Sequence, residues 1–579
     1  MYKANKRHLQ PLLISTVNDL PEKHRKRLEQ SWAGTFYRET FCRIPEDLFA
    51  VLYADIPSRP NVPVNLLVGL DMIKAQYGWS DEELYDRFTF DVQVRYALGY
   101  HSLKEGDFDL RTLYYFRHRL AEHYLKTGVN LLQSAFEQMS DQQALAHKVD
   151  LRVQRMDSTQ IMSNIVDASR VQLLVEVLQR LFRVLSQADQ AGYAAVFAPY
   201  VEQSADHFVY LVKGKPAWEA HLHQIGQVMH RLLTELAAAY HQEPVYQVFQ
   251  RFFEDNYRVA EQTVRPLQND EISAGCLQSV DDLEATFRRK GPQEYKGYAA
   301  NLSESCARQN PLQLITQVQV APNNQEDADL LAESLPELKA RTGVETLYID
   351  GGYGSPAADQ ASIAQKVELV QTGIRGNPPD ADKFNLADFE IVQAEDGKPT
   401  QMTCPGGQTV GVQPGRTTGY LVHFDALLCQ ACPFQKDKRC RAQGGKRDPR
   451  PKLSFTQQEV NWARRRRRHR AFKEEAGNLR AAVEATLRSL KHPFPAGKLP
   501  VRGLFRVTCL IIASAAMVNM RRIHRYVSAP DKPETPEKAT QNVENAQAQP
   551  SQDSFWFIIR ARLAAFQPLN GLTGSCFGF

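Results

Sequence analysis

Hydrophobic positions recur every three or four residues between residues 44 and 125, the spacing that one face of a helix requires. Gly78 is a typical helix end, and Ser80 followed by Asp81-Glu82-Glu83 is a typical helix start. We therefore predict an all-α N-terminal domain, residues 1–145, that either binds DNA or only packs and dimerises. The apolar positions with this spacing include Leu66, Leu67, Leu70, Ile73, Leu84, Phe88, Leu113, Phe116 and Leu120.

From Val149 onward the pattern changes to the alternation of a β-strand. Val149, Leu151 and Val153 lie on one face, and the run stops at Met156-Asp157-Ser158-Thr159. We therefore expect Asp157 at the end of a strand. A stretch from about 166 to 260 then returns to helical spacing and carries no obvious chemistry.

Strand patterns resume after this helical block. The third new strand ends directly in Asp350-Gly351-Gly352-Tyr353-Gly354, so we expect Asp350 at a second strand end. The order β-β-β-α-β predicts an α/β domain with a mixed sheet, residues 146–526, that holds a helical insertion at about 166–290. The elements are strands at Gly297 to Leu302, Leu312 to Val320, Thr346 to Ile349 and Val367 to Thr372, with a helix at about 326–340.

The last third of the chain contains three kinds of sequence. Residues of about 380–455 are rich in loop residues and cysteine, and residues after Phe455 are helical again to Tyr526. The apolar run Val507 to Val518 is shorter than the roughly 20 residues of a membrane span, so we expect a buried helix and no membrane partner. Residues 527–579 combine the composition of a disordered linker with an apolar tail.

Composition and charge narrow the class of protein further. Hydrophobic residues make up 43% and charged residues 23% of the chain, as in a folded soluble protein. The net charge of +4 is small, but it hides a basic run from Arg464 to Arg470. The N-terminus lacks the apolar stretch of a secretory signal, so we expect a cytoplasmic protein.

The two aspartates at strand ends are candidate metal ligands. Neighbouring strands of a mixed sheet end at one edge, so the carboxylates of Asp157 and Asp350 can converge there. Carboxylate oxygens suit Mg²⁺ or Mn²⁺. An aspartate before Ser-Thr or before Gly-Gly is also a common turn or cap residue, so each aspartate taken alone leaves that explanation open.

A third candidate lies on the helix that we predict from Asn478 to Lys491. Arg480, Glu484 and Lys491 are spaced at four and seven residues, which places them on one stripe of that helix. An ordinary solvated face with an Arg-Glu pair has the same spacing. The spacing alone does not decide between a site and a solvated face.

Taken together, three motifs resemble the DDE transposases of bacterial insertion sequences. The stretch Arg155-Met-Asp157-Ser-Thr-Gln-Ile-Met-Ser-Asn looks like the first-aspartate strand of that family, and Thr346-Leu-Tyr-Ile-Asp350-Gly-Gly-Tyr-Gly looks like the second. The third, Arg480-x3-Glu484-x6-Lys491, reproduces the spacing of the family's Tyr-x2-Arg-x3-Glu-x6-Lys signature.

The resemblance spans most of residues 40–526, and it departs from the signature at Gly477, where the family has tyrosine. It implies a fold class: an α/β, ribonuclease-H-like mixed sheet with helical and Cys-rich insertions, preceded by the all-α N-terminal domain. Residues 146–526 would be the catalytic domain.

The same resemblance implies a function and a site. The protein would cleave insertion-sequence ends and join the freed 3′-OH to target DNA. Asp157, Asp350 and Glu484 would hold two Mg²⁺ or Mn²⁺ ions, and Arg480 and Lys491 would contact phosphates near the scissile bond. The implied partners are double-stranded DNA, as terminal inverted repeats and as target, and a second copy in a homodimer at the nucleoid.

Four cysteines form a cluster before the glutamate helix. Cys404 is followed by Cys429-x2-Cys432-x7-Cys440, and four thiolates suit one closed tetrahedral zinc site. Related transposases carry a similar Cys-rich insertion, which favours one structural Zn²⁺. Only one Cys-x2-Cys pair is present, so four unligated buried cysteines are the alternative.

The basic run offers a further candidate contact with DNA. A protein gains affinity from each phosphate that it neutralises, so we predict DNA-phosphate contacts for the arginines of the run. Seven consecutive residues cover every face of a helix, so a solvated stretch is the alternative. The predicted contact residues are Arg464, Arg465, Arg466, Arg467 and Arg468.

Two other functions fit the same motifs. A metal-dependent nuclease or resolvase of the same fold would cut DNA without joining it. A transposase-derived DNA-binding protein would have lost catalysis, although the presence of Asp157, Asp350 and Glu484 argues against such a loss. Strand-transfer assays separate these possibilities.

Overall fold

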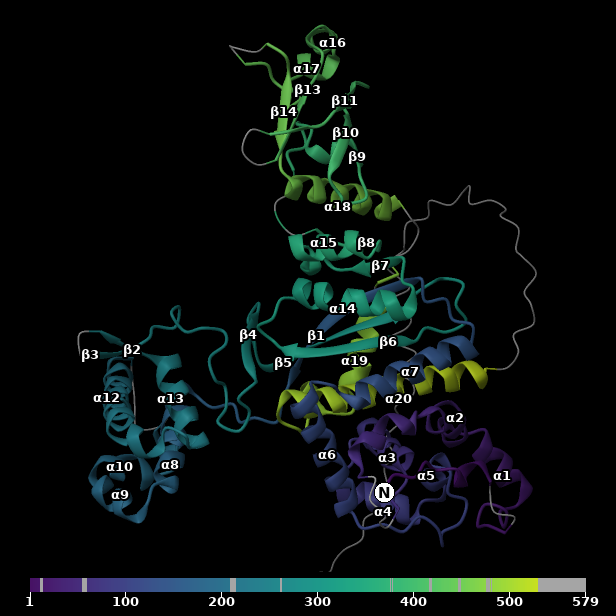
Figure 1. Ribbon diagram of the computed structural model, residues 1–579, viewed down its shortest axis with the longest axis vertical. Coiled ribbons are helices and arrows are strands. Elements are labelled where there is room, and N and C mark those ends of the chain that lie inside the picture. The colour runs from purple at the N-terminus through teal and green to yellow at the C-terminus, as the bar shows by residue number, and fades with distance from the viewer. Residues whose placement is uncertain are drawn as a thin grey trace, which may run out of the picture. The chain divides into compact units, whose positions relative to one another are not determined.

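The computed structural model describes residues 1–529 except 11–13, 55–59, 209–214, 261–262, 375, 377–378, 416–418, 446–448, 475–478 and 481. The expected linker and apolar tail from residue 530 onward lie outside the described residues, as does Gly477. Figure 1 shows the described elements along the chain.

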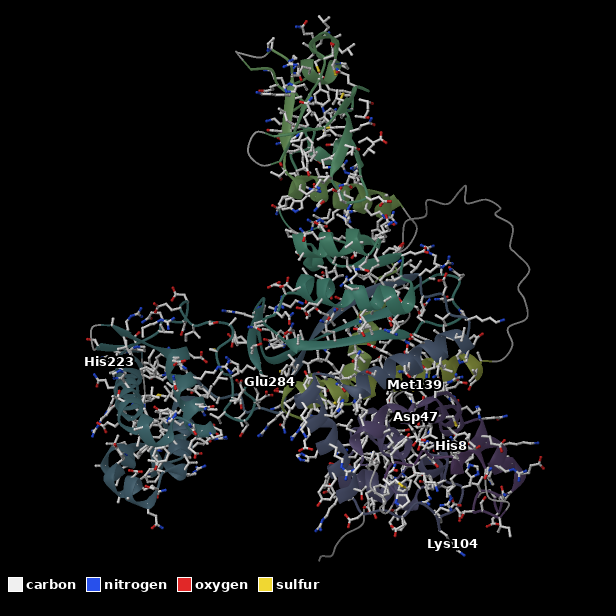
Figure 2. All side chains as sticks on the ribbon, in the orientation of Figure 1. His8, Asp47, Lys104, Met139, His223 and Glu284 are labelled. Carbon is white, nitrogen blue, oxygen red and sulfur yellow. The ribbon has the colours of Figure 1, made fainter. Side chains whose placement is uncertain are left out.

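The N-terminal region is helical, as the apolar spacing predicts. Gly78 ends α3 in the left-handed conformation at φ 69°, and Ser80 and Glu83 form a capping box at the start of α4. Met139 of α7 is among the buried side chains of a core that continues into the sheet and the C-terminal helix (Figure 2). The helices are η1 (Arg7–Leu9), α1 (Glu22–Glu29), α2 (Trp32–Glu39), η2 (Phe41–Arg43), η3 (Glu46–Leu52), α3 (Val64–Tyr77), α4 (Asp81–Phe90), α5 (Val92–Ala97), α6 (Arg111–Thr127) and α7 (Leu131–Ala146).

A six-stranded mixed sheet follows, with the order β4-β5-β1-β7-β8 and β6 paired to β5. Strand β5 pairs antiparallel with β1, β4 and β6, whereas β1, β7 and β8 pair in parallel. The predicted α/β fold with a mixed sheet is therefore confirmed. The strands are β1 (Val153–Met162), β4 (Thr286–Lys290), β5 (Gln293–Ser305), β6 (Ile315–Pro322), β7 (Thr346–Ile349) and β8 (Glu368–Gln371).

Strand β1 is longer than the sequence pattern indicates. It continues past Asp157 to Met162, because β5 is 13 residues long and pairs with β1 as far as Met162 opposite Gly297. The expectation that Asp157 ends a strand is therefore wrong. The pairing of β1 with β7, however, stops at Arg155 opposite Tyr348, so Asp157 lies just beyond the end of β7.

Helices cover both faces of the sheet (Figure 1). Met156 on β1 and Leu347 on β7 pack with Leu331 and Leu335 of α14 in one core. Side chains with the opposite orientation, such as Ile161, pack with α19 and α20 in another. The helices next to the parallel strands are α14 (Asp327–Thr342), η4 (Gly351–Tyr353) and α15 (Pro356–Ala364).

The helical block predicted between the first two strands is present and has a separate hydrophobic core. Leu174, Leu178 and Leu181 of α8 are fully buried in it, which agrees with their helical spacing. Its elements are α8 (Arg170–Val184), α9 (Gln187–Gly192), α10 (Ala194–Val201), α12 (Lys215–Tyr240), α13 (Pro244–Asn256) and the hairpin β2 (Tyr257–Ala260) and β3 (Thr263–Pro266).

The Cys-rich region at about 380–455 contains more regular structure than the sequence indicates. Two three-stranded antiparallel sheets, β11-β10-β9 and β12-β13-β14, enclose a small core that includes Phe389, Met402 and Val422. The strands are two to five residues long, which hides their alternation. The elements are η5 (Leu386–Asp388), β9 (Glu390–Gln393), β10 (Pro399–Thr403), β11 (Thr409–Gly411), β12 (Gln413–Pro414), β13 (Tyr420–His423), α16 (Ala426–Ala431), α17 (Pro433–Lys436) and β14 (Lys452–Phe455).

Three helices complete the described fold. The apolar run of α20 is buried against α3, α7 and β6, as predicted. Among the described residues, α20 is the one helix with the length and hydropathy of a membrane span, but 61% of its apolar window is buried, which is typical of a core helix. Glu284 accepts a hydrogen bond from the backbone N–H of Leu504 at its start (Figure 2). The elements are α18 (Gln457–Glu474), α19 (Val483–Lys491), η6 (Pro495–Gly497) and α20 (Leu504–Val527).

A buried ion cluster joins two strands to two of these helices. The carboxylate of Glu304 on β5 is fully buried and accepts from Arg155 Nε on β1 at 2.7 Å and Arg522 Nη1 on α20 at 2.6 Å. The hydroxyl of Thr486 on α19 lies 3.0 and 3.1 Å from its two oxygens. These contacts fix α19 against β1 and β5.

We expect Glu304→Ala to lower the free energy of unfolding by about 3–5 kcal/mol, because it leaves two buried guanidinium groups without their carboxylate. Chemical denaturation with a helix-sensitive signal measures the change. Glu294→Ala, an exposed glutamate on the same strand, is the matched control and should change stability by less than about 0.5 kcal/mol. Equal midpoints for the two variants would contradict the importance of the cluster.

Candidate active site

The candidate site is built on β1, where successive side chains point to opposite faces. Arg155, Asp157 and Thr159 face the segment around α19, whereas Ser158 faces α14. Arg155 Nη1 donates to the backbone oxygen of Leu479 at 2.5 Å. Strand β1 thus contacts the segment around α19 on one face and α14 on the other.

Asp157 is a buried carboxylate with charged and backbone partners. Its side chain is 10% exposed, and one oxygen accepts from the Ser158 backbone N–H at 3.0 Å. Burial raises the pKa of Asp157, and the nearby charge of Asp350 acts in the same direction. The guanidinium of Arg480 opposes this shift. A cation at this position therefore stabilises the ionised carboxylate.

Asp350 directly follows β7, as predicted, and occupies a more open position. Its carboxylate caps the short helix η4 by accepting from the Gly352 backbone N–H at 2.6 Å, which accounts for an aspartate before two glycines. The side chain is 34% exposed. One oxygen is committed to the cap, and the other faces the guanidinium of Arg480.

Arg480 connects the two aspartates. Its Nη2 atom lies 2.6 Å from Asp157 Oδ2 and 4.0 Å from Asp350 Oδ2, and its side chain is 16% exposed. The helix expected from Asn478 begins only at Val483, so Arg480 lies in the preceding turn and the predicted helical stripe is wrong at this end. The bond from Arg155 to the Leu479 carbonyl holds that turn against β1.

A second layer of polar residues supports the aspartates, and the sequence motifs do not reveal it. Tyr353 is fully buried three residues after Asp350, and its hydroxyl donates to Asn301 Oδ1 on β5 at 2.8 Å. Burial raises its pKa well above the ordinary value, and the charges of the neighbouring aspartates add to the shift. On the same face of the sheet, Ser158 Oγ donates to Asp327 of α14 at 2.7 Å.

Glu484 lies in the first turn of α19 and is exposed. Among the residues that the structure describes, no group of three or more His, Cys, Asp or Glu side chains is arranged to hold a metal ion. The structure brings Asp157 and Asp350 within reach of the same guanidinium, whereas a shared ligand role for Glu484 stays a prediction.

Lys491 lies at the opposite end of α19 and belongs to a basic group. Its Nζ donates to the Thr159 hydroxyl on β1 at 2.9 Å, two residues from Asp157. Burial lowers the pKa of Lys491, and the charges of Arg488 and Lys290 lower it further. Three like charges held close together favour an anion between them.

The basic run on α18 is engaged with carboxylates of the protein. Arg465 is 10% exposed and pairs with the buried Asp359 of α15 at 3.2 Å, and Arg464 lies 3.9 Å from the same residue. Arg468 pairs with Glu368 of β8 at 2.8 Å. Burial also lowers the pKa of Arg467, and Arg466 is partly buried. DNA contact by these arginines stays a prediction, and the ion pairs give several of them a structural role.

The structure gives no support for the predicted zinc site. Cys404, Cys429, Cys432 and Cys440 line one small cavity of about 20 Å³, yet they form no ion-binding group among the described residues. Gln408 donates to the sulfurs of Cys404 and Cys429 at 3.4 Å. Burial raises the pKa of the Cys429 and Cys440 thiols, and the neighbouring cysteines act in the same direction.

The fold and the site together define an α/β protein with an acidic site beside a mixed sheet and a basic segment packed against it. Residues 403–524 match a family model described as a transposase DDE domain. This matched segment supports a DDE transposase. The comparisons with curated proteins and with solved structures found no match.

The matched segment includes part of the site. Glu484, Arg480, Lys491 and the four cysteines lie within it, and Asp157 and Asp350 precede it. The family implies DNA as the substrate, and DDE transposases generally use divalent metal ions.

We expect Arg465→Gln to lower the free energy of unfolding by about 3 kcal/mol, because it leaves the carboxylate of Asp359 buried without its closest cation. DNA binding by the folded protein should keep its salt dependence, since a guanidinium that is 10% exposed has little access to a phosphate. Denaturation and fluorescence anisotropy over a salt series measure the two effects. A flatter salt dependence with unchanged stability would instead assign Arg465 to DNA.

Lys491→Gln should change the salt dependence of DNA binding and leave stability nearly unchanged, which is the reverse of the effects expected for Arg465→Gln. We expect the slope of log affinity against log salt to flatten by about 1, because one phosphate contact is lost. Stability should change by less than about 1 kcal/mol, since the neighbouring charges already disfavour the charged lysine. The same anisotropy series measures the slope, and an unchanged slope would remove Lys491 from the DNA contacts.

Proposed function

We propose that this protein is a DNA transposase that cleaves insertion-sequence ends and joins the 3′-OH to target DNA by two-metal-ion phosphoryl transfer. The observation that carries the proposal is the contact of one cation, the Arg480 guanidinium, with both Asp157 and Asp350 at 2.6 and 4.0 Å. Two carboxylates that face one cation, one on β1 and one directly after β7, are suited to share a metal ion. The transposase DDE domain at residues 403–524 supports the same function.

The order of the sheet supports a ribonuclease-H-like fold for the catalytic domain, residues 146–526. The path β6-β5-β1-β7-β8 has three antiparallel strands followed by two parallel ones. The first aspartate lies on the central strand β1, and the second follows its parallel neighbour β7. We propose that residues 1–145 are a helical DNA-binding or dimerisation domain in front of it.

The carboxylates fit a hard divalent cation such as Mg²⁺ or Mn²⁺. Asp157 and Asp350 would hold it, with Glu484 as the third ligand from the start of α19. When bound, the metal ions supply a nucleophile at neutral pH and charge stabilisation for the leaving oxygen. The Tyr353–Asn301 and Ser158–Asp327 hydrogen bonds anchor the two segments that carry the aspartates.

The basic residues beside the carboxylates would bind the DNA strand. Arg480 offers a planar guanidinium for one phosphate, and Lys491 with Arg488 and Lys290 offers a compact group of charges for another. The resulting partners are the double-stranded terminal repeats and the target DNA. We propose a homodimer at the nucleoid, because two transposon ends require two such sites.

Glu484→Gln should abolish both cleavage and joining while DNA affinity stays within about twofold, because affinity comes mainly from neutralised phosphates and the rate from metal-stabilised charge. The assay uses purified protein, Mg²⁺ and DNA that carries the flanking repeats of its own element. Glu337→Gln, an exposed glutamate on α14, is the matched control and should retain activity.

The products of this assay decide between related functions. Cleaved ends without joined products from the unchanged protein would favour a nuclease. Near-normal strand transfer by Glu484→Gln would remove this residue from the ligands.

A further inference from the structure

Arg480 forms ion pairs with both aspartates of the candidate site. Its side chain is 16% exposed, and its Nη2 atom is at hydrogen-bond distance from Asp157 Oδ2. That oxygen is committed to the guanidinium, and Oδ1 accepts from the Ser158 backbone N–H. A metal ion that binds Asp157 must therefore compete with this ion pair.

Electrostatics makes this competition unavoidable. The charges of Asp157 and Asp350 repel each other, so the guanidinium of Arg480 stabilises the pair of carboxylates. A divalent ion at the same position would lie within a few ångströms of the guanidinium, and like charges at that separation repel. The ion and Arg480 thus disfavour each other unless a second anion takes up the guanidinium.

We propose that Arg480 is a resident cation that competes with a divalent ion for the two aspartates until a DNA phosphate draws the guanidinium away, so that DNA and the divalent ion bind cooperatively. The inference rests on the proposed function for its metal ion and its DNA. The position of Arg480 favours such a switch, because this residue lies in the turn before α19 and not within the helix. The Arg480 side chain can therefore change partner while Thr486 keeps α19 in place. Coupling of this kind is reciprocal, since the phosphate also binds better when the metal has displaced Arg480.

The test measures Mn²⁺ binding by electron paramagnetic resonance of the free ion, with and without a short DNA duplex at low salt. For the unchanged protein, we expect the duplex to increase Mn²⁺ affinity about tenfold. Arg480→Gln should bind Mn²⁺ about tenfold more tightly than the unchanged protein without DNA, and the duplex should then add little. Arg480→Lys keeps the charge and should retain most of the coupling.

Arg488→Gln is the matched control, because it removes a positive charge from α19 that has no contact with the aspartates in the described structure. It should weaken duplex binding and leave DNA-free Mn²⁺ affinity within about twofold. Circular dichroism checks that each variant is folded.

The outcomes separate the two proposals. Mn²⁺ binding that is equal in the unchanged protein and in Arg480→Gln would overturn the resident-cation inference and leave the metal-dependent function intact. The same gain in affinity for Arg488→Gln as for Arg480→Gln would also overturn it, since general charge would then explain the effect. No Mn²⁺ binding by any form, with or without DNA, would overturn both.

Discussion

The fold around the site depends on one buried carboxylate. Glu304 is fully buried on β5 and binds groups from β1, α19 and α20, which are far apart in the sequence. A buried charge is tolerated only when its partners are in place, so these elements must adopt one register relative to one another. Arg155 precedes Asp157 by two residues and Thr486 follows Glu484 by two. The same cluster therefore sets how the first-aspartate strand meets the glutamate helix.

Successive side chains of β1 point to opposite faces of the sheet, so the position of this strand fixes the contacts on both faces. Met156 enters the apolar core under α14, while Asp157 on the opposite face meets Arg480. Because β7 stops pairing with β1 at Arg155, Asp157 is left without a strand neighbour on that side. Arg480 Nη2 lies 2.6 Å from Asp157 Oδ2 at this position, just beyond the end of the β1–β7 pairing.

The sequence reveals the parts of this arrangement that depend on local signals. Asp350 after a buried strand, the capping box at Ser80 and the apolar run of α20 are all present as predicted. The extent of β1 beyond Asp157 was not predictable from its own residues, because it depends on the length of β5. The ion pair of Arg465 with Asp359 was not predictable from the sequence either, because Asp359 lies more than one hundred residues earlier and only the fold brings the two residues together. The spacing of the cysteines likewise predicts that they lie close together, and all four line one small cavity.

The site also joins two stretches of the chain with opposite charge. The carboxylates come from β1 and the end of β7, and the cations come from the segment that carries the transposase DDE domain match. Neither stretch alone has balanced charge: the two aspartates repel each other, and so do Lys491 and Arg488. Docking α19 on β1 brings Arg480 to the aspartates and leaves the lysine end as a separate anion-attracting group. The protein thus presents adjacent positions of opposite charge, which is the pattern that a phosphodiester and a hard metal ion together require.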